Sequence, residues 1–160
     1  MKARTLLMTG VAVASTALTG GLATDPNSAY YRGLKQPSWQ PAPPVYGLVW
    51  TPLYADLAVT TAQAADALEQ QGRSGQRAAL IRALSANLVL NASWNWLFFK
   101  ANRPWIAAAE CAALTASSAD LVRRVASADR RAGWALTPYP LWCAFATALT
   151  VAIARRNPSR

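Results

Sequence analysis

Long runs without charged residues dominate the hydrophobic pattern of this chain. Residues 5–24, 83–99 and 132–154 form uncharged runs of 20, 17 and 23 residues. An α-helix needs about 20 mostly apolar residues to cross roughly 30 Å of hydrocarbon, so the three runs are long enough, or nearly so, to span a bilayer. Two further runs, 46–68 and 104–124, are weaker because they contain acidic residues. The pattern therefore favours an all-α membrane protein with three clear spans and two weaker ones.

Acidic residues inside the weaker runs restrict how those helices can lie. A charge at the middle of a bilayer costs about 2.5–3.5 kcal/mol on insertion scales. Asp66 and Asp120 lie near the ends of the runs, where they can reach water, whereas Asp56 and Glu110 lie ten and six residues in. We expect Asp56 and Glu110 to face protein, water or each other.

The N-terminal run allows two interpretations. A basic start, an apolar stretch and small residues are typical of a secretory signal peptide. The later uncharged runs favour a retained helix instead, because a secreted soluble domain does not need them. Gly10 with Ala14, and Ala17 with Gly21, also have the small-xxx-small spacing that lets helix backbones pack closely. This spacing suggests a homodimer formed through the first helix.

Residue types that the chain lacks exclude several kinds of active site. There is no His, so the commonest general base and metal ligand is missing, as is the proximal ligand of a globin-type haem. Cys111 and Cys143 are too far apart for a zinc motif and are expected to be small buried hydrophobes. No phosphate loop or nucleophile motif is present in the sequence. We expect no metal site, no resident cofactor and no conventional hydrolytic or redox chemistry.

A stripe of amide and aromatic residues follows one face of the helix expected at 80–99. Four residues spaced at i, i+4, i+7 and i+11 form it: Asn87, Asn91, Trp94 and Phe98. An unsatisfied buried amide costs about 1–3 kcal/mol, so both Asn side chains need partners. They either hydrogen-bond to neighbouring helices or bind a ligand, and both roles can hold together.

Two other expected helices present aromatic rings at helical spacing. Trp50 and Tyr54 are one turn apart, and so are Trp142 and Ala146, with Pro138 starting or bending the last helix. Each ring can stack on a ligand while its N–H or O–H donates a hydrogen bond. A small Ala beside Trp142 would leave room for such a ligand.

Three sequence blocks point to a known family. Residues 30–54, YYRGLKQPSWQPAPPVYGLVWTPLY, combine five prolines with two tryptophans. This block resembles the TspO/MBR family of tryptophan-rich sensory or translocator proteins, bacterial type. NLVLNASWNWLFF at 87–99 and PYPLWCAFATALT at 138–150 resemble two further blocks of that family, in the same order. Departures from the family pattern occur at Tyr30, Ala42, Asn87 and Thr150.

The resemblance implies a five-transmembrane-helix bundle with a ligand pocket capped by the loop between helices one and two. It implies one domain over residues 1–160 in a multi-pass integral protein of the bacterial cell membrane, and family habit adds a homodimer. The five spans are expected at about 5–24, 46–68, 80–99, 104–124 and 132–154. Ligand-binding residues implied by the resemblance and the helical faces are Trp39, Trp50, Tyr54, Asn87, Asn91, Trp94, Trp142 and Ala146.

Charge agrees with a membrane partner and not with nucleic acid. On a five-span topology, Lys and Arg divide nine to seven between the two sides, which slightly favours an N-terminus inside the cell. The formal net charge of +9 is thus spread over the loops, where it suits anionic headgroups. It forms no single basic face of the kind that binds nucleic acid.

The resemblance implies flat hydrophobic ligands of the porphyrin class, such as protoporphyrin IX. We expect a membrane receptor or sensor with a role in tetrapyrrole transport or regulation. Sterol binding is not expected, because the short Tyr-centred sterol signature is missing around Tyr139. Two alternatives stay open: an enzyme that degrades porphyrin with light and oxygen, using Trp50 and Trp142, and a helix-packing membrane protein without a specific ligand.

Overall fold

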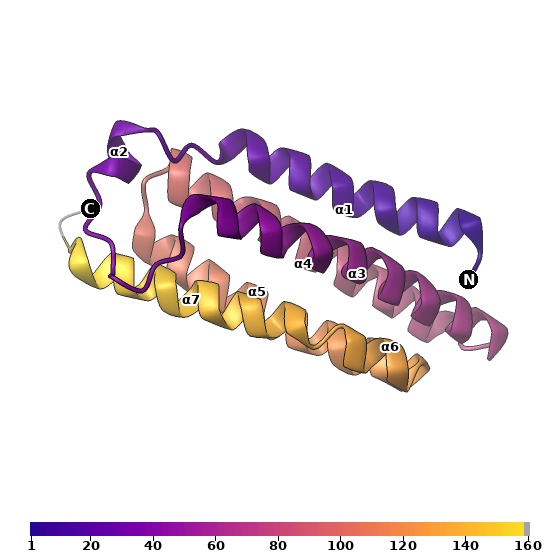
Figure 1. The fold of residues 1–160 in the computed structure, drawn as a ribbon. Helices are drawn as coiled ribbons and strands as arrows, with labels where there is room; N and C mark the ends of the chain where they lie inside the picture. Colours follow the sequence, from indigo (N-terminus) through magenta and orange to yellow (C-terminus); the bar gives the residue numbers. More distant parts are fainter. Residues whose placement is uncertain (159–160) are drawn as a thin grey trace.

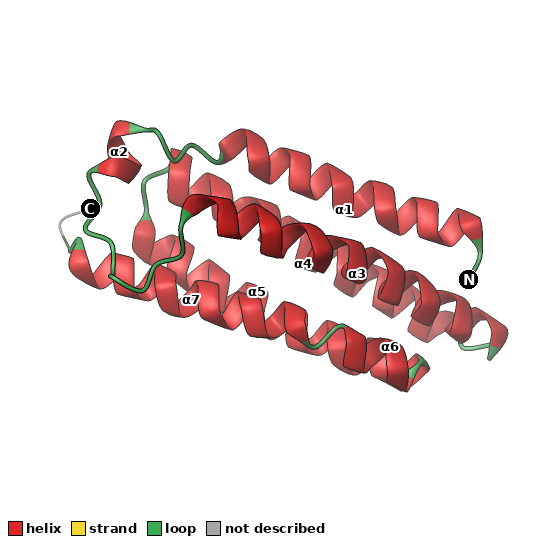
Figure 2. Ribbon diagram, in the orientation of Figure 1, coloured by secondary structure: helices red, strands yellow, loops and turns green. Residues whose placement is uncertain are grey.

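Helices make up almost all of the chain. The computed structural model describes residues 1–158, and this part of the chain contains helices, turns and loops but no strand (Figure 2). The long helices lie side by side along one axis, and the chain starts at one end of the bundle while its last helix finishes at the other (Figure 1). The elements in order are α1 (Ala3–Ala23), α2 (Ala29–Arg32), α3 (Pro43–Gln70), α4 (Ser74–Asn95), the π-helix η1 (Trp96–Lys100), α5 (Pro104–Ala128), α6 (Arg130–Ala135) and α7 (Pro138–Arg156).

Proline and glycine positions explain where several helices begin and end. α3 and α5 each start with Pro at their first position, where the missing N–H costs nothing. Gly72 follows α3 with a φ of 70°, a left-handed conformation that suits glycine. The helices α3 and α4 are therefore joined by a tight turn and pack antiparallel.

Two expected helices differ from the structure. The helix expected at 80–99 begins at Ser74, and its last turn widens into η1, where the Ala101 N–H donates to the Trp96 carbonyl at 2.9 Å. The span expected at 132–154 is interrupted at Pro138, the residue that was expected to start or bend the last helix. α6 ends at Ala135 and α7 begins at Pro138, because proline cannot donate the backbone hydrogen bond that a continuous helix would need.

α1 packs as one of the bundle's helices, against α3 and α4. The Asp66 carboxylate of α3 accepts hydrogen bonds from the Lys2 backbone N–H and, at 2.6 Å, from the Thr5 hydroxyl. Farther along, the Thr9 hydroxyl donates to the Ala58 carbonyl at 2.9 Å. These contacts favour the retained helix over the signal-peptide interpretation.

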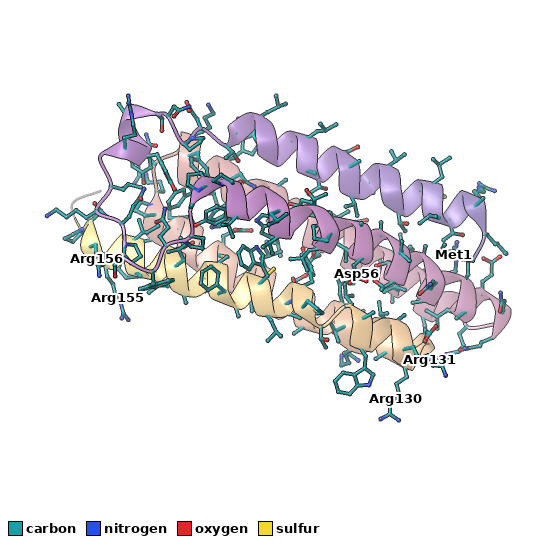
Figure 3. The ribbon with its side chains drawn as sticks, viewed as in Figure 1. Met1, Asp56, Arg130, Arg131, Arg155 and Arg156 are labelled. Atoms are coloured by element: carbon teal, nitrogen blue, oxygen red, sulfur yellow. The ribbon has the colours of Figure 1, made fainter. Side chains whose placement is uncertain are left out.

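Membrane character is clearest at the two ends of the chain. α1, and α6 with α7, are the helices of residues 1–158 that are long and apolar enough to span a bilayer, with mean hydropathies of 1.6 and 1.4. Large apolar side chains are nevertheless exposed on the other three long helices, at Leu48, Val89 and Ile106. Figure 3 shows Arg155 and Arg156 at one end of the bundle and Arg130 and Arg131 at the other.

Candidate ligand-binding site

A cavity of about 330 Å³ lies between the long helices, in the half of the bundle nearest α2. α1 contributes small residues to its wall, and α3, α4, η1 and α7 contribute mainly aromatic and aliphatic ones. Six of the expected ligand-binding residues line it: Trp50, Tyr54, Asn91, Trp94, Trp142 and Ala146.

Stacked rings form two aromatic walls of the cavity. On the first wall, Trp50 of α3 stacks on Tyr54 with a centroid separation of 5.2 Å and meets Trp142 of α7 edge-on at 6.4 Å. On the second wall, Trp94 of α4 stacks on Phe98 of η1 at 5.4 Å. Both stacked pairs are spaced i, i+4, which brings side chains together on one helix face. The sequence spacing therefore creates the flat surfaces directly.

A chain of hydrogen bonds runs from this wall into the core. The Tyr54 hydroxyl donates to Asn91 Oδ1 at 2.6 Å, and Asn91 Nδ2 donates to the Tyr139 hydroxyl at 3.1 Å. The Tyr139 hydroxyl then donates to Asn87 Oδ1 at 2.7 Å, and Asn87 Nδ2 donates to Ser118 of α5 at 3.1 Å. The chain thus connects α3, α4, α7 and α5 below the cavity, and each Asn has the partners that a buried amide needs.

Two buried donors beside the cavity lack such partners. The indole N–H groups of Trp94 and Trp142 have no hydrogen-bond acceptor within residues 1–158. A buried unsatisfied N–H costs about 1–3 kcal/mol. An acceptor supplied by a bound molecule would remove that cost.

The connection between α1 and α3 covers the end of the cavity. Tyr31 stacks against Phe99 at 5.4 Å and accepts a 2.8 Å hydrogen bond from the Gln40 side chain. Burial raises the pKa of the Tyr31 phenol, and the hydrogen bond from Gln40 partly offsets that rise. Two hydrogen bonds join Lys35 to Asn157 at the end of α7. The Lys35 backbone N–H donates to Asn157 Oδ1 at 3.0 Å, and Asn157 Nδ2 donates to the Lys35 carbonyl at 3.2 Å.

Comparison with known proteins agrees with this arrangement. A sequence model of the TspO/MBR family matches residues 8–156. The chain belongs to the TspO/MBR family. The tryptophan-rich sensory protein of Cereibacter sphaeroides is 29% identical over 155 residues, which cover 97% of this chain and 93% of that protein. The uncharacterized membrane protein YtaB of Bacillus subtilis is 28% identical, and the tryptophan-rich protein TspO of Bacillus cereus 24%, each over 80% of both chains.

Membership confirms the family resemblance and makes this TspO/MBR protein a helical membrane protein. In the structure, two of the expected ligand-binding residues lie away from the cavity. Asn87 is fully buried one turn below Asn91, among its hydrogen-bond partners. Trp39 is 48% exposed on the cap and meets Phe145 edge-on at 5.8 Å. Neither lines the cavity, although Trp39 matches the family pattern and Asn87 lies in a family block as a departure from it.

Several residues of this TspO/MBR site have no signal in the sequence. Gln40 and Asn157 hold the cap closed, but each lies in a polar stretch without periodicity. Gly20 is buried against α4, where an added Cβ would lie 2.7 Å from Asn95 Nδ2. The spacing of Ala17 with Gly21 on α1 was interpreted as a dimer contact, yet both residues line the cavity.

The acidic and thiol side chains are placed largely as expected. Glu110 faces α4, where one carboxylate oxygen accepts a 3.2 Å hydrogen bond from Ser93. Asp56 keeps one buried carboxylate oxygen without a hydrogen-bond partner within residues 1–158. Cys111 and Cys143 are buried free thiols, as predicted, with Cys111 also at the cavity wall.

Proposed function

We propose that this TspO/MBR protein is a membrane receptor or sensor that binds flat hydrophobic ligands of the porphyrin class and takes part in tetrapyrrole transport or regulation. The observation that carries the proposal is the convergence of Trp50, Trp94 and Trp142, from three helices, on one cavity. Its volume of about 330 Å³ is at the lower end of the range usual for small-molecule sites.

The stacked rings would supply the binding energy, because an aromatic pair contributes about 0.5–1.5 kcal/mol beyond the area that it buries. A flat macrocycle can contact both aromatic walls at once. The unpartnered indole N–H groups of Trp94 and Trp142 favour a ligand that carries hydrogen-bond acceptors.

The proposal includes five membrane spans in a bacterial cell membrane. α1, α3, α4, α5 and α7 have 21, 28, 22, 25 and 19 residues, and about 20 are needed to cross a bilayer. Each exposes large apolar side chains to the surroundings: Leu18, Leu48, Val89, Ile106 and Leu141. The connection from α1 to α3 would then cap the cavity at one membrane surface.

A titration with protoporphyrin IX in the dark tests the proposal. Detergent-purified protein is followed by tryptophan fluorescence, with Trp50→Phe and Trp142→Phe variants and a Trp134→Phe control. Trp134 is 66% exposed on α6 and lies outside the cavity wall. We expect saturable quenching that both cavity variants weaken about fivefold, or about 1 kcal/mol, and that the control leaves unchanged. Linear quenching, equal in all four proteins, would instead support a helix-packing protein without a specific ligand.

A second candidate function is the light- and oxygen-dependent degradation of porphyrin. It is favoured by the edge-on contact of Trp50 and Trp142, whose ring centroids lie 6.4 Å apart. Both rings would contact a ligand that absorbs light. Illumination of the loaded protein in air should then consume several equivalents of porphyrin per protein, and the double Trp→Phe variant should not. Loss of porphyrin at the same rate in both proteins, or in empty detergent, would reject the enzymatic function.

A further inference from the structure

α1 and the first half of α3 each contribute one exposed glycine to the cavity wall, Gly21 and Gly47. We propose that ligands enter there, from the side of the bundle, through an opening formed by Gly21 of α1 and Gly47 of α3. The inference rests on the proposed function, because an entrance matters only for a cavity that binds a ligand. It adds the route and the class of molecule that can use it.

The two glycines share three properties. Both line the cavity, and both are exposed to the outside. At each, an added Cβ would meet no heavy atom within 4 Å. The space beside each glycine is therefore open, and no side chain fills it. Gly20, by contrast, is buried against Asn95, so α1 is sealed on its α4 side.

The burial of side chains along α3 indicates that α3 and α1 separate beside the cavity. One face of α3, with residues spaced at i, i+4, i+8, i+11 and i+15, runs along the helix beside α1. At Ala58 and Ala62 this face is buried, and the Ala58 carbonyl accepts the hydrogen bond from Thr9 of α1. At Gly47, Thr51 and Ala55 the same face is exposed. The two helices thus pack together in one half of the bundle and leave a gap beside the cavity in the other.

The rim of the opening is apolar. Leu18 and Leu22 of α1 are 72% and 77% exposed, and Leu48 of α3 is 76% exposed. No charged residue occurs in 5–24 or 36–55, the segments that form the rim. Such a rim suits hydrocarbon rather than water, so the opening would face the acyl chains of the bilayer.

The other route, through the cap, is closed by specific contacts. Leu34 of the connection is buried, and Tyr31 lies against Phe99. Two hydrogen bonds join Lys35 to Asn157. A molecule arriving from water would have to break these contacts, whereas a molecule dissolved in the membrane would meet only the glycine gap. The class of ligand is therefore one that partitions into lipid before it binds, with a flat shape that passes between two helices.

The test is kinetic, because an obstructed entrance slows association and dissociation together. Wild-type protein in phosphatidylcholine vesicles is mixed with protoporphyrin IX in a stopped-flow instrument, and tryptophan quenching gives both rates. We expect Gly21→Leu and Gly47→Leu each to slow both association and dissociation about tenfold, or about 1.4 kcal/mol in the barrier. Gly21→Ala and Gly47→Ala should slow them much less, because the effect is steric.

Two controls make the outcome decisive. Gly75→Leu places the same side chain on another exposed helical glycine, at the far end of α4, with nothing within 4 Å of its Cβ. Asn157→Ala removes the hydrogen bonds that hold the cap, and we expect it to leave the rates unchanged. Leucine variants that bind as fast as Gly75→Leu, or faster binding by Asn157→Ala alone, would overturn the lateral entrance. An absence of saturable quenching in the wild type would instead refute the proposed function.

Discussion

Removing one hydroxyl group from the core should destabilise the bundle more than removing a similar one at the cavity wall. Tyr139 is fully buried, and its hydroxyl both accepts from Asn91 Nδ2 and donates to Asn87 Oδ1. Tyr139→Phe removes the partner of Asn91 Nδ2 and of Asn87 Oδ1, while the other atom of each amide keeps its hydrogen bond. Each unsatisfied buried group costs about 1–3 kcal/mol, so two sum to about 2–6 kcal/mol. Because each amide keeps another hydrogen bond, we expect the lower end, a loss of about 2–3 kcal/mol.

Tyr54→Phe is the matched comparison. In the wild type, the Tyr54 hydroxyl donates a hydrogen bond to Asn91 Oδ1 at the cavity wall. Water in the cavity can replace that donor, so the expected loss is about 1 kcal/mol or less. The two variants remove the same atom from the same residue type, and they differ in burial and in the number of amides affected.

Thermal unfolding of the detergent-purified proteins, followed by circular dichroism, measures the difference. At about 2–4 °C per kcal/mol for a chain of this size, Tyr139→Phe should lower Tm by about 4–12 °C. Hydrogen bonds between membrane helices average only about 0.6 kcal/mol in some systems, which would limit the drop to about 2–5 °C even for two bonds. If Tyr139→Phe lowers Tm no more than Tyr54→Phe does, the buried hydrogen bonds of Tyr139 do not stabilise the bundle more than the one at the cavity wall, and the reasoning is refuted.

Two further predictions concern glycines. Gly133→Ala should lower the free energy of unfolding by about 2–3 kcal/mol, because the new Cβ would lie 2.6 Å from the Ala126 Cα and force α6 away from α5; chemical denaturation that shows no loss relative to Gly75→Ala would contradict this. We also propose a homodimer through the Gly10 face of α1, where an added Cβ would meet nothing within 4 Å in the single chain. Gly10→Leu should therefore shift the protein to a smaller species on size-exclusion chromatography in detergent, and an unchanged elution volume would exclude this face.

Local pattern was sufficient for the features that depend on neighbouring residues. Pro138 marks the start of α7, and the spacing of Trp50 with Tyr54 and of Trp94 with Phe98 predicts the stacked pairs. Periodicity gives the face on which a residue lies but not its depth along the bundle. Asn87 shares a face with Asn91, yet it lies one turn below the cavity because the cavity occupies only the capped half.

Features that depend on distant parts of the chain could not be predicted. Lys35 and Asn157 are 122 residues apart, and nothing near either residue indicates the other. The widening of the helix at η1 also has no local mark. The exposure of Gly47 depends on the distance between two helices, which no pattern within one helix contains.

The hydrogen bonds between Lys35 and Asn157 close the chain from α3 to α7 into a non-covalent ring. α1 lies outside this ring, held at its start by Asp66 and at its end by the Thr24 hydroxyl, which bonds to Asn95 at 3.0 Å. Widening the gap beside Gly21 therefore strains the attachment of α1 but leaves the aromatic walls in place. If the protein binds the proposed ligand, these walls are already arranged, so that little binding energy would go into ordering them.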